Sequence, residues 1–291
     1  MFPRVPDYHK PNRPLVPNGL GVIYVLISAT YLFLLYYFKK PVELEASNIV
    51  SPALTLAVCI LFGGFMGLLD DWMDLPWRYK AFFPLIAAIP LVSFAMELKL
   101  RTSIAIPILG AIDFGAYYYL IIIPIIVTVI TNTVNQLGGL NGLETVCPAI
   151  VIIGLIIVSG SFAFLLYIPL IVWLALALLN LQGKIFVGNS GSFAIGLTLA
   201  AFAIISDIKT CLLISVLPYI FNSALILLTY FFFRTKASVS FDGEKLSSDH
   251  KRSLITLITY HRHLTERQVV AIISLLVAAS TTVAVLVQLS L

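Results

Sequence analysis

Long apolar segments alternate with short polar ones from Leu20 to the last residue of the chain. Several of the apolar runs reach the roughly 18 residues that suggest a membrane-spanning helix. Residues 101–109, RTSIAIPIL, alternate partly and predict a strand or hairpin on the surface. The pattern predicts about nine membrane helices, near Leu20–Phe38, Ile49–Leu69, Phe82–Met96, Phe114–Thr131, Thr145–Ser159, Ser161–Leu179, Ser192–Ser206, Thr210–Phe233 and Gln268–Leu291.

Composition supports a membrane protein and excludes a soluble one. Of the 291 residues, 60% are hydrophobic and only 11% are charged, whereas a soluble domain carries roughly 25% charged residues. The three cysteines, Cys59, Cys147 and Cys211, all lie in apolar segments, so they predict neither a disulfide framework nor a metal site. We therefore expect an all-α, polytopic integral membrane protein in which residues 1–291 form one domain.

The basic residues are distributed unevenly between the two sides of the predicted bundle. Thirteen of the 18 Lys and Arg residues fall on the side that holds the N-terminus, the loop after Leu69 and the long loop 234–267. Cytoplasmic loops of membrane proteins carry an excess of Lys and Arg. The N-terminus is therefore predicted to be cytoplasmic and the C-terminus to lie outside. Every Gly/Asn-rich segment falls on the cytoplasmic side, where we expect the catalytic loops.

The first candidate segment is GGFMGLLDDWMDLPWRYK, residues 63–80. At helical spacing Asp70 and Asp71 both face Asp74, so the three carboxylates are expected to share one surface. Acids at a bilayer boundary are costly and usually mark a function. Two carboxylates can hold Mg²⁺, or one can act as a base, while Lys80 can neutralise phosphate. The alternative is a solvated loop between two membrane helices.

The second segment is TNTVNQLGGLNGLE, residues 131–144. Asn132, Asn135 and Asn141 interleave there with glycines. Glycine lets a backbone approach a ligand closely, and asparagine offers both amide donors and a carbonyl acceptor. The alternative is a turn between two helices, in which Asn141 and Glu144 resemble a capping box. Capping is expected to account for Glu144, whereas the asparagines favour ligand binding.

The third segment, KIFVGNSGS at 184–192, opens the seventh predicted helix. Asn189, Ser190 and Gly191 place free backbone N–H groups at a helix N-terminus, which is a natural site for an anion. A simple N-cap is the alternative.

The fourth segment is the loop 234–267, which ends in YHRHLTER. His261, Arg262 and His263 lie just before the last helix, and two histidines around an arginine favour phosphate recognition. A solvated basic loop near anionic headgroups is the alternative. Thr265 and Gln268 predict a capping box for the last helix.

Five motifs in chain order resemble the polyprenyl-phosphate N-acetylhexosamine-1-phosphate transferase family. They are HKPNRPLVPNGLG, GLLDDWMDLPWRYK, NTVNQLGGLNGLE, KIFVGNSGS and the HRH before the last helix. The resemblance covers nearly the whole chain, and WRYK and NGLE are more similar to the archaeal and eukaryotic branch than to the bacterial MraY enzymes. It implies transfer of a sugar 1-phosphate, with GlcNAc-1-phosphate expected, from a UDP-sugar to a polyprenyl or dolichyl phosphate. UMP is released, and lipid-linked glycan synthesis begins.

The resemblance also implies roles for individual residues. Asp70 and Asp71 match the family's aspartate pair, of which one is a candidate base for the lipid phosphate. Asn135 and Asn189 match metal-ligand positions, for Mg²⁺ or alternatively Mn²⁺. The substrate-binding matches are a phosphate-binding lysine, a position near the uridine and positions around the diphosphate and sugar; they comprise Lys80, Asn132, Asn141, Gly142, His261, Arg262 and His263.

Three departures from the family pattern stand out. At Asn189 most members have aspartate, and asparagine keeps a carbonyl oxygen but lacks the charge. At Gly138 MraY has an aspartate, which counts against a muramyl-peptide donor. The family has ten helices, whereas no helix is predicted before HKPNRPLVPNGLG.

The partners expected from the resemblance are the UDP-sugar, the lipid phosphate and the membrane, with no nucleic acid. A homodimer stays open. The cell membrane is the expected location, or the endoplasmic reticulum membrane in a eukaryote.

Two other classes deserve comparison. A UbiA-type prenyltransferase has about nine helices and an aspartate-rich Mg²⁺ motif, but it needs a second such motif where this chain carries Asn and Gly. A cation-coupled transporter is expected to place ionisable groups inside its helices, which are nearly free of charge here. Both are less favoured than the phosphotransferase.

Overall fold

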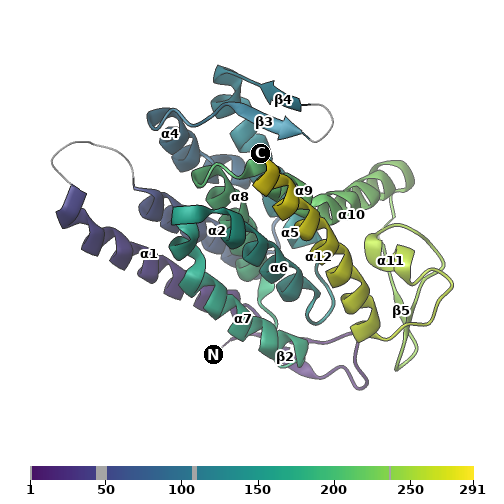
Figure 1. The fold of residues 1–291 in the computed structure, drawn as a ribbon. Coiled ribbons are helices and arrows are strands. Elements are labelled where there is room, and N and C mark those ends of the chain that lie inside the picture. The colour runs from purple at the N-terminus through teal and green to yellow at the C-terminus, as the bar shows by residue number, and fades with distance from the viewer. Residues whose placement is uncertain (1, 44–50, 107–109, 236) are drawn as a thin grey trace.

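The computed structural model describes residues 2–43, 51–106, 110–235 and 237–291. Within these residues, seven helices are long and apolar enough to cross a membrane, or eight if the bent pair 209–215 and 217–232 counts as one span. The chain is therefore a polytopic α-helical membrane protein, as the apolar pattern predicts. Figure 1 shows the helices packed into one bundle, with short strands and loops at its ends.

The described elements are mostly helical. The α-helices are α1 Gly21–Glu43, α2 Pro52–Met73, α3 Trp77–Ala87, α4 Ile89–Glu97, α5 Ile123–Gln136, α6 Leu143–Val158, α7 Tyr167–Leu181, α8 Gly188–Ile205, α9 Lys209–Ser215, α10 Leu217–Leu228, α11 Leu254–Ile258 and α12 Glu266–Ser290. Shorter 3₁₀ or π turns are η1 Tyr118–Ile122, η2 Gly160–Leu166 and η3 Thr229–Phe233. Three antiparallel hairpins pair β1 Arg4–Pro6 with β2 Leu15–Pro17, β3 Ser103–Ile106 with β4 Gly110–Asp113, and β5 Ser240–Phe241 with β6 Leu246–Ser247.

Each of the nine predicted apolar segments contains helix, but the count of nine spans is not confirmed. The fifth segment corresponds to α6, which has only 16 residues. The third is broken into α3 and α4, and the eighth into α9 and α10. The predicted start of the second helix, at 49, lies outside the described residues. The hairpin predicted around 101–109 is confirmed by the pairing of β3 with β4, although residues 107–109 are not described.

Helix α8 lies at the centre of the bundle. It packs against α1, α2 and α5, and its contact with α2 is the most extensive between any two elements. In Figure 1 it runs inside the bundle rather than along its outer surface, and 89% of its span is buried. The residues of α8 therefore face other helices instead of lipid.

Glycine allows the backbones of α2 and α8 to approach closely. A Cβ on Gly67 would lie 2.1 Å from the carbonyl oxygen of Asn189, which is far inside van der Waals contact. A Cβ on Gly21, at the start of α1, would lie 2.1 Å from the Cα of Gly191. Both contacts hold the N-terminus of α8 against a neighbouring helix, and Gly67 lies one turn before Asp71 on α2.

The bend between α9 and α10 has a specific cause. Pro218 has no backbone N–H, so the carbonyl of Ile214, four residues earlier, loses its helical partner. Ser280 of α12 donates its hydroxyl to that carbonyl at 2.5 Å. The two segments meet at 54°. This hydrogen bond ties the bend to the last helix.

The glycine contact between α2 and α8 generates a prediction. Gly67→Ala should lower the free energy of unfolding by about 1–3 kcal/mol, because a methyl group has no space against the Asn189 carbonyl. Thermal unfolding of the detergent-purified protein measures the effect. Phe65→Ala is the control, since Phe65 lies on the same helix with its side chain largely exposed. Equal melting temperatures for the Gly67 variant and the wild type would contradict the packing.

Candidate functional site

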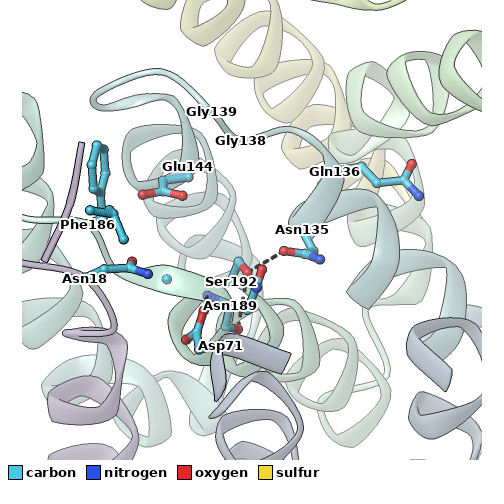
Figure 2. A pocket seen from close by; sticks show the side chains of 12 residues that line it. Asn18, Asp71, Asn135, Gln136, Gly138, Gly139, Glu144, Phe186, Asn189 and Ser192 are labelled. Atoms are coloured by element: carbon cyan, nitrogen blue, oxygen red, sulfur yellow. Dashed lines mark hydrogen bonds between the residues drawn. The ribbon is translucent and has the colours of Figure 1, made fainter. Parts of the chain in front are cut away.

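A polar cavity of about 320 Å³ opens where the ends of α2, α5, α6 and α8 meet the N-terminal hairpin. Figure 2 shows Asp71, Asn189 and Ser192 close together beside Asn135, with Glu144 and Phe186 on another wall. Residues from five separate stretches of sequence line it: Val5, Asn18, Asp71, Asn135, Gln136, Gly138, Gly139, Glu144, Phe186, Gly188, Asn189 and Ser192. The structure thus brings together the second and third candidate segments and one residue of the first.

Asp71 is bound to the N-terminus of α8. One carboxylate oxygen accepts the backbone N–H of Asn189 at 2.9 Å, and the other accepts that of Ser190 at 3.0 Å. Free N–H groups at a helix N-terminus favour an anion through both hydrogen bonding and the helix dipole. The sequence predicts an anion site there, and the group that occupies it is a carboxylate of the chain itself. The wall of the cavity beside α8 is therefore negative.

Asn135 and Ser192 form a second hydrogen-bonded pair in the cavity. The Ser192 hydroxyl donates to the side-chain oxygen of Asn135 at 2.7 Å (Figure 2), and it also lies 3.3 Å from the backbone oxygen of Asn189. These contacts place the two predicted metal-ligand residues, Asn135 and Asn189, around one serine. The side-chain oxygen of Asn135 is thereby fixed on the cavity side of α5.

Glu144 does not cap α6, and the predicted capping box is wrong. The N-cap is Gly142, whose φ of 95° places it in the left-handed region, and no side chain caps the helix. The Glu144 carboxylate instead lines the cavity. Burial, opposed by a backbone hydrogen bond from Val187 and reinforced by the nearby Asp71 charge, raises the pKa of Glu144 to about 7. Glu144 is therefore a cavity residue and not part of a helix cap.

Asp70 faces a different partner from Asp71. Its carboxylate is almost fully buried, pairs with the ammonium of Lys80 at 2.8 Å and accepts the backbone N–H of Leu75 at 3.0 Å. The other oxygen, Oδ2, is buried and has no hydrogen-bond partner among the described residues. Lys80, predicted to bind phosphate, thus neutralises Asp70 in this structure.

The prediction that Asp74 shares a surface with Asp70 and Asp71 is wrong. Helix α2 ends at Met73, and Asp74 is its C-cap, with a φ of 46°. The Asp74 side chain is exposed. Helical spacing therefore stops applying one residue before it.

Asn141 is buried at the junction of three chain segments. Its side-chain amide donates to Asp7 at 2.8 Å and to Glu266 at 3.0 Å, and its backbone N–H donates to Glu266 at 2.7 Å. The Asn141 carbonyl oxygen is buried and has no partner within the described ranges. The residue thus ties the N-terminal hairpin to the start of α12, outside the residues that line the cavity.

Gly142 and Asn132 also lie outside the lining of the cavity. The backbone N–H of Gly142 donates to the side chain of Asn180 at 2.7 Å, and the side chain of Asn132 donates back to the Thr128 carbonyl of its own helix at 2.9 Å. Asn180 also donates to the Ile185 carbonyl at 2.9 Å. It joins the Gly142 turn to the segment before α8.

The basic segment before α12 is exposed. His261, Arg262 and His263 all reach solvent, and none of them lines the cavity. The ring of His263 lies 3.8 Å from the Asp242 carboxylate of the β5–β6 hairpin. The capping box of Thr265 and Gln268 is confirmed at the start of α12.

Sequence reasoning missed several residues of this region. Asn18 and Phe186 line the cavity, and the backbone N–H of Phe186 donates to the Pro17 carbonyl at 2.8 Å. Asn18 stood inside the motif HKPNRPLVPNGLG, and Asn180 stood as a polar residue within an apolar run. Asn18 and Asn180 are conspicuous as polar residues in their segments, but the sequence does not tell which of them faces the cavity.

The donor groups of the cavity suit a hard cation such as Mg²⁺, which prefers oxygen ligands. The side-chain oxygens of Asp71, Asn135, Glu144 and Asn189 are among those that line the cavity. No group of three His, Cys, Asp or Glu side chains with metal-binding geometry occurs among the residues that the structure describes. A cation here would therefore depend on amide and substrate oxygens in addition to carboxylates.

Comparison with known proteins gives consistent matches. The family model described as glycosyl transferase family 4 matches residues 53–207. A Saccharolobus solfataricus protein, provisionally named as a UDP-N-acetylglucosamine–dolichyl-phosphate N-acetylglucosaminephosphotransferase, is 32% identical over 97% of this chain and 87% of its own length. The Saccharomyces cerevisiae protein of that name is 27% identical over 74% of this chain and 58% of its own. A phospho-N-acetylmuramoyl-pentapeptide-transferase of Streptococcus equi is 25% identical over 85% and 74%.

The contact between Asp71 and α8 predicts a measurable stability effect. Asp71→Asn removes the negative charge that binds two N-terminal amides of α8, and should lower the free energy of unfolding by about 0.5–2 kcal/mol. Thermal unfolding of the purified variant tests this, with Asp74→Asn as the exposed control. If both variants melt with the wild type, the carboxylate contributes nothing to the helix.

Proposed function

Because the chain belongs to glycosyl transferase family 4, we propose that it transfers a sugar 1-phosphate from a UDP-sugar to a polyprenyl or dolichyl phosphate. GlcNAc-1-phosphate is the group proposed, since the archaeal and yeast relatives are named for UDP-N-acetylglucosamine and dolichyl phosphate. The products are UMP and a lipid diphosphate sugar. Membership of this family favours the phosphotransferase over the UbiA-type prenyltransferase and the cation-coupled transporter.

One observation carries the proposal beyond the family match. A carboxylate, Asp71, lies at the wall of a polar cavity beside the hydrogen-bonded pair of Asn135 and Ser192, at the ends of membrane helices. Such a cavity can admit a polar diphosphate, while the lipid chain of the acceptor stays among the helices. This juxtaposition suits a reaction between a water-soluble donor and a membrane-bound acceptor.

The proposed reaction exchanges one phosphorus–oxygen bond for another. An oxygen of the lipid phosphate bonds to the phosphorus that carries the sugar, and the bond between the two phosphates of the UDP-sugar breaks. UMP leaves with the electron pair of that bond. Phosphoryl transfer depends mainly on in-line positioning and on neutralising the charge of the equatorial oxygens. The protein therefore has to hold two anions close together.

We assign the acceptor side to the aspartate pair. Asp71, which lines the cavity, is the proposed base for the lipid phosphate, since its carboxylate oxygens keep acceptor capacity beyond the two α8 amides. Lys80 retains donors beyond its contact with Asp70, so it can also hold a phosphate oxygen. Asp70 keeps that ammonium beside the cavity end of α2.

The donor side is assigned to the asparagines and the basic segment. Asn141 is the proposed contact for the uridine, and within the described ranges its buried side-chain oxygen has no hydrogen-bond partner. Arg262, with its neighbours His261 and His263, is exposed and can meet the diphosphate or sugar. Arginine binds phosphate oxygens through paired N–H donors, which suits that task.

Mg²⁺, or alternatively Mn²⁺, is the proposed cofactor. Asn135 and Asn189 are its proposed ligands, and the neighbouring Asp71 carboxylate, together with that of Glu144 when ionised, supplies negative charge. When bound, the cation would neutralise phosphate oxygens of the substrate. Asn189 brings no charge of its own, so the affinity of the free site rests on those carboxylates.

The cavity is proposed to open to the cytoplasm. It lies on the side of the predicted bundle that carries 13 of the 18 Lys and Arg residues, which favours the cytoplasmic side. Nucleotide sugars are expected on that side. The cell membrane, or the endoplasmic reticulum membrane in a eukaryote, is the proposed location.

Turnover with defined substrates tests the function. Purified protein with Mg²⁺, polyprenyl phosphate and labelled UDP-GlcNAc should release UMP and form a labelled lipid. Asp71→Asn should lose at least about a hundredfold in rate, the scale of a lost general base, while Asp74→Asn stays near the wild type. No turnover with UDP-GlcNAc or any related UDP-sugar would refute the proposed activity.

Asn189 offers a test of the metal ligand. Asn189→Asp adds a charged oxygen ligand and should lower the Mg²⁺ concentration at half-maximal rate several-fold, with the enzyme still active. Titration of the rate with Mg²⁺ measures this, and Ser190→Ala serves as a neighbouring control. An unchanged Mg²⁺ profile would remove Asn189 from the metal site.

A further inference from the structure

Asn222 is a buried polar residue inside a membrane helix. It lies on α10, beyond the bend at Pro218, and only 2% of its surface is exposed. A polar side chain in an apolar setting is costly unless its hydrogen bonds are satisfied. Both ends of the Asn222 amide are satisfied, and the two partners belong to different parts of the chain.

The first partner is the end of α5. The Asn222 amide donates to the backbone carbonyl of Gln136 at 3.3 Å. Gln136 is the last residue of α5, so its carbonyl has no helical partner of its own. It follows Asn135 directly and lines the cavity. Asn222 thereby fixes α10 to the wall that carries the proposed metal ligand.

The second partner is the start of α11. The Asn222 carbonyl oxygen accepts the backbone N–H of Leu254 at 2.8 Å. This N–H belongs to the first turn of a short helix and also lacks an intrahelical acceptor. Figure 1 shows α11 beside the end of α10, within the loop that leads to α12. One side chain therefore satisfies a free backbone group at the C-terminus of α5 and another at the N-terminus of α11.

Backbone hydrogen bonds join the segment after α11 to the end of that helix. The Thr259 carbonyl accepts the backbone N–H of Ser248 at 3.1 Å, and His261 donates its N–H to the Ser248 carbonyl at 3.0 Å. Arg262 donates its backbone N–H to Thr259 at 3.0 Å. A displacement of α11 would therefore carry His261 and Arg262 with it.

We propose that Asn222 is a positioning residue that holds α11, and with it the segment 261–263, at a set place relative to the end of α5. Its effect on turnover rests on the proposed function, in which Arg262 meets the diphosphate or sugar and Asn135 lies at the metal. Asn222 touches neither substrate. It acts by fixing the position of the basic segment 261–263 relative to the cavity wall at the end of α5.

Hydrogen exchange tests the positioning without any substrate. In the detergent-purified full-length protein, Asn222→Leu should speed exchange of the amides in 254–263 by about tenfold or more, the effect of losing buried hydrogen bonds worth over 1 kcal/mol. Ser223→Ala is the matched control, because Ser223 is the next residue, is also buried, and its hydroxyl has no partner among the described residues. Unchanged exchange in 254–263 would overturn the proposal.

Kinetics then test whether the position matters for the donor. Asn222→Leu should raise KM for UDP-GlcNAc about tenfold with little change in kcat. In a protein that already carries Arg262→Ala, Asn222→Leu should raise KM little further, because the residue that it positions is gone. The effects of the two substitutions on KM are then non-additive. Effects that multiply in the double variant would overturn the route through the basic segment.

Two further outcomes keep the tests separate. If the leucine variant does not fold, Asn222→Ser, whose hydroxyl can satisfy one of the two partners, takes its place in both measurements. Wild-type protein without turnover would refute the proposed function, while the exchange result would still decide whether Asn222 holds α11.

Discussion

The contact between the Asp71 carboxylate and the first amides of α8 organises this molecule. It joins α2 to the central helix at the point where the cavity opens. The contact is close only because Gly67, one turn earlier on α2, has no side chain to separate the two backbones. The hydrogen bonds of the Asp71 carboxylate to α8 thus require the close approach that Gly67 allows. The same carboxylate stabilises the helix and sets the electrostatic character of the site.

Other polar side chains also join distant segments of the chain at this end of the bundle. Asn141, Asn180 and Asn222 each use one amide to join segments that are distant in sequence. Amide side chains carry a donor and an acceptor without a charge, so they can satisfy backbone groups inside an apolar bundle at a lower desolvation cost than ions. Amide side chains thus join the loops around the cavity, and for Asn141 the partners are the carboxylates of Asp7 and Glu266.

Much of the fold was predictable from the sequence, because apolar length and periodicity decide which segments become membrane helices. The number of spans was not, since breaks such as the one at Pro218 depend on a partner, Ser280, that compensates the lost hydrogen bond. The chemistry of the site was predictable in outline from clustered Asp and Asn residues. Their partners were not: helical spacing alone could not show that Asp70 turns to Lys80 while Asp71 turns to α8. The spacing of Asn141 and Glu144 does not distinguish a capping box from a carboxylate that lines a cavity.

The burial of α8 bears on how the protein is assembled in the bilayer. Of the seven candidate spans in the described chain, α8 has the lowest mean hydropathy and the largest buried share. Its polar first turn finds partners on α2 and α5, which both precede it in the chain. Without those helices, α8 would lack the hydrogen bonds of its first turn and the close glycine contacts with α1 and α2. The stability of this helix, which has a low hydropathy for a span, therefore rests on its packing against helices that precede it in the chain.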